Sequence, residues 1–255
     1  MAKMVIEYLP FEKQYAFHEC KAKFRALITG VGFGKTVAGA NELLKMALTH
    51  PKSLHVIIAP NTKILQNATL VEFYNYARPF IAHETKSRNL ITLVNGAQIL
   101  YLTADNHRHI ERLRGLTIGS AWLDEAALFL PGVWDILIAR LRSKYGPLLM
   151  IITTTPKGFD WIHSLFVNKE LPGSRTKLPN AKDYEWFGGT TLDNPFTPQE
   201  FKATIMHQYE GMFKEQEIYG KFVGFEGQVY KNFNMNIHVI KGSWSLTDRG
   251  VALVK

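Results

Sequence analysis

The chain has 255 residues, of which 46% are hydrophobic and 12% aromatic, enough for one sizeable domain or a core domain with a small appendage. Its 30 lysines and arginines against 22 acidic residues give a net charge of +8, which favours an anionic partner such as nucleic acid, a nucleotide or a membrane surface. The single cysteine, Cys20, excludes an internal disulfide framework, and no apolar run approaches the roughly 20 residues that a membrane span needs.

Short apolar runs rich in β-branched residues alternate with helical patterns along the chain. The runs lie at 26–28, 54–59, 121–123 and 148–153, and they suit strands covered on both faces of a parallel sheet. Apolar residues recur with the helical period over 36–50. The segment 88–102 has the pattern of two strands joined by the favoured turn residues Asn95 and Gly96. This order predicts a doubly wound α/β sheet with an antiparallel addition.

The last third of the chain differs in composition. Prolines and glycines punctuate 172–198, a helical pattern covers 198–221, and a glycine-spaced aromatic segment follows to about residue 233. We therefore divide the chain into a core of 1–180 and a smaller part of 181–255.

Residues 29–36, TGVGFGKT, follow one predicted strand and open a predicted helix, which is the context of a phosphate-binding loop. Glycines let the backbone curl so that its N–H groups face phosphate oxygens, and the positive end of the helix dipole also attracts the phosphate. Lys35 would reach the β- and γ-phosphates of a nucleotide, and the Thr36 hydroxyl would ligate Mg²⁺. Thr29 stands where the usual pattern has glycine, and the alternative interpretation is an ordinary glycine-rich turn. The predicted contacts are Gly30, Val31, Gly32, Phe33, Gly34, Lys35 and Thr36.

Two acids, Asp124 and Glu125, end the apolar run at 121–123. Asp124 would face the Mg²⁺ through its water shell, and Glu125 could take a proton from an attacking water. An acid pair after an apolar run is by itself usually a solvated helix start. Together with the loop it indicates nucleotide hydrolysis, because kinases of small molecules need no such glutamate.

Two polar features fit a nucleotide-driven machine. Thr153, Thr154 and Thr155 end the apolar run at 148–153, where their hydroxyls could hydrogen-bond the γ-phosphate or its water. Gln14 lies shortly before the loop, and its amide offers both a donor and an acceptor to an adenine edge. For the threonines, the alternative is three β-branched residues in a strand.

The ordered set of motifs resembles the ATPase domain of the large subunit of a tailed-bacteriophage terminase, over residues 10–240. The resemblance is carried by Gln14, TGVGFGKT, the turn at Asn95, and the stretches RLRGLTIGSAWLDEA (112–126), TTTPKGFDW (153–161) and TTLDNP (190–195). It implies a P-loop NTPase fold of the additional-strand, conserved-glutamate type, with a lid subdomain within 181–255. It also implies an ATP-driven motor that moves double-stranded DNA into a procapsid.

The resemblance also implies partners and a place of action. The partners are double-stranded DNA, the portal protein, the small terminase subunit and further copies of the chain. These copies would form a ring on the portal, usually of five, with a monomer in solution as the alternative. The place is the host cytoplasm and, transiently, the portal vertex, with no membrane involved.

By the same resemblance, Lys35 and Thr36 bind the phosphates and Mg²⁺, Asp124 binds the metal, and Glu125 is the catalytic residue. The three threonines at 153–155 couple hydrolysis to motion, and Gln14 contacts adenine. Many such proteins have a phosphate-sensing arginine in the loop where this chain has Val31. A finger arginine acting on a neighbouring subunit is expected in the predicted helix 133–142, at Arg140 or, less favoured, at Arg142.

The sequence also bears on DNA binding and on nuclease activity. The basic residues Arg108 and Arg112 are candidate DNA phosphate contacts, with a solvated basic face or structural arginines near the nucleotide as the alternatives. Whole large terminases also carry a nuclease domain, and 224–240 resembles the lead-in to it. We therefore expect ATPase but no nuclease activity from these 255 residues.

Three competing functions share parts of this pattern. A helicase or recombination ATPase would bring a second similar domain or filament-forming segments, and would separate a forked duplex. A small-molecule kinase would transfer phosphate to an acceptor. A non-catalytic assembly module is disfavoured by the intact set of Lys35, Thr36, Asp124 and Glu125.

Overall fold

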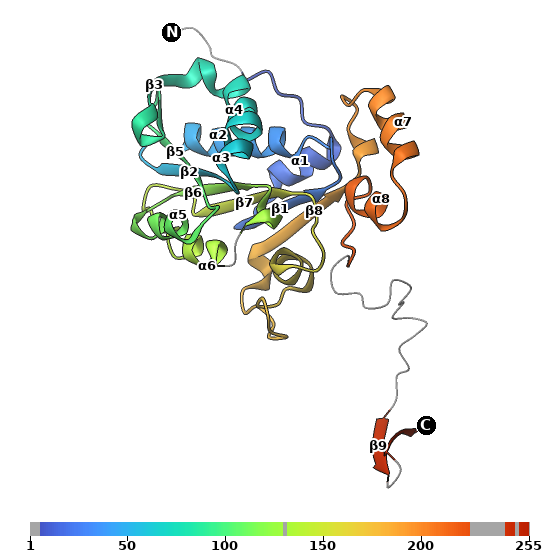
Figure 1. Cartoon of the computed structure of the whole chain (residues 1–255). Coiled ribbons are helices and arrows are strands. Elements are labelled where there is room, and N and C mark those ends of the chain that lie inside the picture. Colours follow the sequence, from blue (N-terminus) through green and yellow to red (C-terminus); the bar gives the residue numbers. More distant parts are fainter. Residues whose placement is uncertain (1–5, 130–131, 225–242, 248–249, 255) are drawn as a thin grey trace. The chain divides into compact units, whose positions relative to one another are not determined.

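The computed structural model describes residues 6–129, 132–224, 243–247 and 250–254 (Figure 1). The chain divides into two units, 1–223 and 224–255, and most of the described residues lie in the first. The strands of the first unit are β1 (Phe24–Thr29), β2 (Leu54–Ala59), β3 (Ile81–Thr85), β4 (Leu90–Leu93), β5 (Gln98–Thr103), β6 (Ser120–Asp124), β7 (Leu149–Thr154) and β8 (Tyr184–Gly189). Its α-helices are α1 (Glu12–Glu19), α2 (Lys35–Thr49), α3 (Thr62–Ile64), α4 (Leu70–Ala77), α5 (His107–Arg112), α6 (Val133–Ile138), α7 (Gln199–Gln208) and α8 (Gly211–Glu217).

The strands form one sheet in the order β3-β4-β5-β2-β6-β7-β1-β8. From β5 to β8 all neighbouring strands are parallel, and β3 and β4 add an antiparallel edge. Strand β7 lies between β1 and β6, so an additional strand separates the phosphate loop from the acid pair. The expected fold class is confirmed, a mainly parallel sheet of the additional-strand P-loop type with helices on both faces.

Alternating side chains along the central strands feed two cores, one on each face of the sheet. On β2, Val56 and Ile58 join the core under α5 and α6, whereas Ile57 joins the core under α2 and α4. Figure 1 shows these two groups of helices on opposite faces. This arrangement explains why the strands are continuously apolar in sequence rather than alternating.

The predicted elements are largely present, with two helices shorter than expected. The helix predicted over 133–142 ends at Ile138, because Ile118 pairs its backbone with Arg140 and Arg142 in a short parallel bridge. The helical pattern over 198–221 is split into α7 and α8, because Tyr209 and Glu210 adopt extended backbone between them.

The predicted division between residues 180 and 181 falls inside the first unit, just before β8. Strand β8 pairs with β1 over its whole length, from Phe24 opposite Tyr184 to Thr29 opposite Gly189. Residues on both sides of the division therefore share one sheet. The lid subdomain within 181–255 stays a prediction.

The second unit is described only at β9 (Ser243–Thr247) and β10 (Gly250–Val254), which pair in antiparallel fashion. The expected lead-in at 224–240 lies, apart from residue 224, outside the described residues. Within the described parts of the chain, none of the helices has the length and apolar character needed to cross a membrane.

Candidate phosphate-binding site

The loop between β1 and α2 has the backbone geometry of an anion cradle. Gly32 and Gly34 have φ of 72° and 89°, left-handed values that favour glycine, and Gly34 caps the N-terminus of α2. Within the described residues, none of the amides from Gly32 to Thr36 donates a hydrogen bond. These N–H groups, at the positive end of a 15-residue helix, are available to an anion.

Lys35 lies inside this loop. Its side chain is 7% exposed and its ammonium donates to the Gly30 carbonyl at 3.1 Å. Burial lowers the pKa of Lys35, and the nearby carboxylates of Glu125, Asp124 and Glu217 oppose that shift. A buried lysine is thus held among acids inside the loop.

Asp124 lies at the carboxyl end of β6, 1% exposed, and faces the start of α2. Its carboxylate accepts hydrogen bonds from Thr153 Oγ1 and Thr69 Oγ1, both at 2.7 Å, and from Thr36 Oγ1 at 3.4 Å. Burial and the neighbouring Glu125 raise the pKa of Asp124 to about 6, against the hydrogen bonds from the two closer threonines. A hydroxyl and a carboxylate at this separation are hard oxygen ligands that fit Mg²⁺ with its water shell.

Glu125 follows directly, in a left-handed backbone conformation with φ of 49°. Non-glycine residues rarely adopt this conformation, which costs free energy and recurs at functional sites. It turns the chain sharply after β6 and keeps Glu125 close enough to Lys35 and Asp124 to shift the pKa of both. The side chain is half-buried, so that water can reach it.

Two of the three threonines at 153–155 bond Asp124 or the turn that follows the acid pair. Thr153 accepts from Trp122 Nε1 at 2.7 Å and donates its own proton to Asp124. Thr154 accepts from the Ala127 amide, in the turn that follows Glu125, at 3.1 Å. The end of β7 is therefore bonded directly to Asp124 and, through Ala127, to the turn that follows Glu125.

The candidate finger arginines do not join this site. Arg140 donates to the Arg114 carbonyl at 2.5 Å, and Arg142 to Thr117 Oγ1 at 3.2 Å. Both lie beside residues 116–118, before β6 begins, whereas Asp124 ends β6, roughly 20 Å away along an extended chain. Arg108 and Arg112, the candidate DNA contacts, are exposed on α5 and are likewise not part of the loop site.

Several side chains at the site had no role assigned from the sequence. Thr69 reaches Asp124 from a π-helical turn, Leu65–Thr69, which links α3 to α4 and has no sequence signal. Thr191, Asn194 and Thr197 hold carbonyls of the loop, at distances from 2.6 to 2.8 Å. The stretch TTLDNP that contains two of them carried part of the resemblance and was the available signal.

A cavity of about 310 Å³ opens beside the loop, next to Gln14. The Gln14 amide donates to the Gly34 carbonyl at 3.1 Å and its oxygen accepts from the Phe11 amide at 3.4 Å. The other residues that line the cavity are Glu7, Tyr8, Leu9, Gly34, Val37, Tyr76, Asn194 and Phe196. Gln14 thus contacts the phosphate loop and lines an aromatic cavity next to it, where the base of a bound nucleotide could lie.

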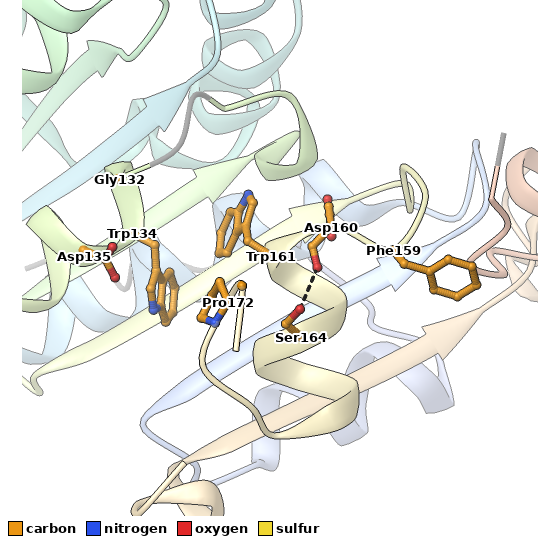
Figure 2. A pocket seen from close by; sticks show the side chains of 9 residues that line it. Gly132, Trp134, Asp135, Phe159, Asp160, Trp161, Ser164 and Pro172 are labelled. Carbon is orange, nitrogen blue, oxygen red and sulfur yellow. Dashed lines mark hydrogen bonds between the residues drawn. The ribbon is translucent and has the colours of Figure 1, made fainter. Parts of the chain in front are cut away.

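A second cavity, of about 410 Å³, lies on the α6 face of the sheet (Figure 2). Trp134, Trp161 and Phe159 contribute aromatic rings to it, and Asp135 and Asp160 contribute carboxylates. None of the predicted site residues lines it.

The family profile described as "Terminase large subunit, T4likevirus-type, N-terminal" matches residues 27–237. The chain belongs to this family. The match includes the loop, the acid pair, the threonines and TTLDNP, and it confirms the resemblance drawn from these motifs. It favours terminase over the helicase, kinase and assembly-module alternatives.

Curated relatives agree with this terminase assignment. The large terminase subunit of Thermus virus P23-45 is 26% identical over 256 residues, which cover 91% of this chain and 53% of that protein. The large terminase subunit of Thermus phage G20c has the same identity and coverage. The chain spans about half the length of the curated relatives it matches.

Solved terminase structures share the fold. The large terminase of a thermophilic bacteriophage superimposes with a TM-score of 0.73 at 16% identity, covering 89% of this chain and 57% of that one. The ATPase domain of the Thermus phage P74-26 large terminase gives 0.63 at 24% identity, covering 86% of this chain and 96% of that one. These likenesses support the fold class independently of the motifs.

Proposed function

We propose that this terminase chain hydrolyses ATP with Mg²⁺ at the loop site, and that hydrolysis drives double-stranded DNA into a procapsid. One observation carries the proposal. The Thr36 hydroxyl at the head of α2 and the Asp124 carboxylate at the end of β6 meet at 3.4 Å, beside the buried ammonium of Lys35. Metal ligands, a phosphate-binding cation and available loop amides thus converge at one sheet edge.

Each residue has a distinct task in this proposal. Lys35 leaves the Gly30 carbonyl and neutralises charge on the β- and γ-phosphates, while the loop amides bind the remaining oxygens. Thr36 and Asp124 hold Mg²⁺, which when bound neutralises charge that develops on the phosphate oxygens. Glu125 accepts a proton from the water that attacks the γ-phosphorus.

Nucleotide complexes of a structural relative support ATP as the substrate class. The large terminase of the same thermophilic bacteriophage has been solved with ADP and with ATP-γ-S. In this chain the cavity beside Gln14 lies next to the phosphate loop, where a base attached to loop-bound phosphates would fit. We assign adenine recognition to Gln14 and the rings around it, and ATP with Mg²⁺ as the cofactors.

The remaining predicted roles concern coupling and assembly. Thr153, Thr154 and Thr155 would transmit the state of the site through Asp124 and the turn after Glu125. Arg140 is remote from the phosphate loop of its own chain, so as a finger arginine it would act on the ATP of a neighbouring subunit. The subunits would form a ring that docks on the portal protein, and the small terminase subunit would be a further partner. The exposed Arg108 and Arg112 would hold DNA phosphates without reading sequence. The place of action would be the host cytoplasm and the portal vertex.

The test is ATP turnover per subunit across protein concentration, with and without double-stranded DNA, for the wild type and for Glu125→Gln. We expect Glu125→Gln to lose about 10²-fold or more in turnover, because the general base is removed, while it still binds Mg-ATP. Turnover per subunit should rise with concentration, because a neighbour completes the site. Equal turnover in the two proteins would contradict hydrolysis at this site.

A further inference from the structure

The segment 190–197 contacts the phosphate loop through three side-chain donors. Thr191 Oγ1 donates to the Val31 carbonyl at 2.6 Å. Asn194 Nδ2 and Thr197 Oγ1 both donate to the Gly32 carbonyl at 2.8 Å. Two donors on one carbonyl fix the direction in which that peptide group points.

The planarity of the peptide bond turns this fixation into a statement about the neighbouring amides. In a trans peptide the C=O and the next N–H point in opposite directions. When the Gly32 carbonyl points toward Asn194 and Thr197, the Phe33 N–H points away from them, into the loop. By the same rule, the bond from Thr191 to Val31 turns the Gly32 N–H inward.

The preceding peptide has the reverse orientation, which shows that the direction is not a general property of the loop. The Gly30 carbonyl points inward and accepts from Lys35 Nζ at 3.1 Å. The Val31 N–H points outward and donates to the Glu217 carbonyl at 2.7 Å. Peptide direction thus changes at Val31, where the donors of segment 190–197 begin.

The segment is itself firmly held. Lys202 is buried at the start of α7, and its ammonium donates to the Asn194 carbonyl at 2.6 Å and to the Leu192 carbonyl at 3.3 Å. Asp193 accepts from the Thr190 amide and from Lys13 Nζ, both at 2.6 Å. A rigid support of this kind can impose an orientation on a glycine-rich loop, which alone could adopt several.

We infer that Asn194 and Thr197 are positioning residues that hold the Gly32–Phe33 peptide with its N–H facing the phosphates of the bound nucleotide. This inference rests on the proposed function, because it concerns the same loop. The two side chains act on the peptide, and neither lies at the metal ligands. Asn194 also lines the cavity beside Gln14, whereas Thr197 does not, so Thr197 tests the positioning role without a change in the cavity lining. Both side chains couple phosphate affinity to the segment that joins β8 to α7.

The experiment compares the affinity of the full chain for a fluorescent Mg-ADP with the midpoint of thermal unfolding without nucleotide. Thr197→Val removes the hydroxyl at nearly constant volume, and Thr197→Ser keeps it. Asn194→Asp loses the donor to Gly32 while its Oδ1 can still accept from the Phe196 amide, as it does at 2.9 Å. The matched control is Thr204→Val, because Thr204 is exposed on α7 and bonds only its own helix.

We expect Thr197→Val to raise the dissociation constant about fivefold, the effect of one hydrogen bond of ordinary strength. Asn194→Asp should raise it more than tenfold, because the new charge also repels phosphate. Thr197→Ser and Thr204→Val should match the wild type, and the unfolding midpoint of Thr197→Val should stay within about 2 °C of it.

Three results separate the possible failures. Wild-type affinity in Thr197→Val would overturn the inference, whatever the affinity of Asn194→Asp, because the new charge of that variant weakens binding by itself. A lowered unfolding midpoint with unchanged affinity would also overturn it and leave a structural role. Lys35→Ala is the reference for the site as a whole. If Lys35→Ala binds Mg-ADP as tightly as the wild type, the proposed function fails rather than the positioning role.

Discussion

Asp124, which ends β6, and Asp160, which lies in the segment after the neighbouring strand β7, are both largely buried, but their surroundings differ. Burial raises the pKa of each to about 6. Asp124 accepts from three threonine hydroxyls that come from three different segments. Asp160 accepts with Oδ1 from the amides of Ile162 and His163 at the start of its own helix, and its buried Oδ2 has no partner among the described residues.

A raised carboxyl pKa is therefore not by itself evidence for a catalytic or metal site. Both carboxylates carry the cost of burial, but around Asp124 distant segments supply converging hydroxyls, a buried ammonium and a second acid. Around Asp160 the local bonds are those of a helix cap, beside the cavity of Figure 2. Convergence of distant groups is the stronger indication of function.

The largest expected effect separates the two aspartates by activity. Asp124→Asn should lower Mg-ATP turnover by about 10²-fold or more, because a neutral amide holds Mg²⁺ poorly while the shape of the site is kept. Asp160→Asn is the matched control, with the same chemical change at the other aspartate, and should stay within about twofold of the wild type. The measurement is steady-state turnover at saturating Mg-ATP. Equal losses in both variants would remove the distinction.

A smaller effect separates them by stability. The pKa of Asp160 rises from 3.8 in the unfolded chain to about 6 in the folded one, so between these values the folded protein binds more protons. The contribution of Asp160 to the free energy of unfolding therefore falls as pH rises from about 4 to 6, and then levels off. Asp160→Asn removes this titration and keeps an oxygen for the cap, so above pH 7 it should stabilise the protein by about 1 kcal/mol, a value discounted for partial exposure.

Urea unfolding of wild type and Asp160→Asn at pH 5 and pH 8 measures this effect, since groups common to both proteins cancel in the difference. The stabilisation should be larger at pH 8. A variant that is less stable than the wild type at pH 8 would show that the Asp160 charge has a favourable partner.

Local patterns made much of the fold predictable. The run at 54–59 coincides with β2, and the helix after the loop begins at Lys35, because strand burial and loop chemistry are written in neighbouring residues. Strand β8 was not predicted, since YEWFGG at the sheet edge mixes buried and exposed positions without a clear alternation. The split between α7 and α8 was missed for a similar reason, because an extended pair interrupts a helical period without proline.

The site was predictable only where its residues lie in motifs. Lys35, Thr36, Asp124 and Glu125 follow predicted strands, so the shared carboxyl edge of a parallel sheet brings them together. Asn194 and the loop carbonyl that it holds are 162 residues apart, and such a contact depends on tertiary packing that no local pattern encodes. The arginine at 140 was placed on a helix, but strand-like pairing with Ile118 fixes its backbone instead.

A crystal structure of this chain with Mg²⁺ and a non-hydrolysable ATP analogue would most directly test whether the loop between β1 and α2 binds the phosphates. We expect β- and γ-phosphate oxygens within hydrogen-bonding distance of the Gly32 and Phe33 amides. We also expect Lys35 Nζ to have moved from the Gly30 carbonyl to the phosphates, with the metal between Thr36 and Asp124. Phosphates bound elsewhere, with Lys35 still on Gly30 and no metal at Asp124, would contradict this expectation.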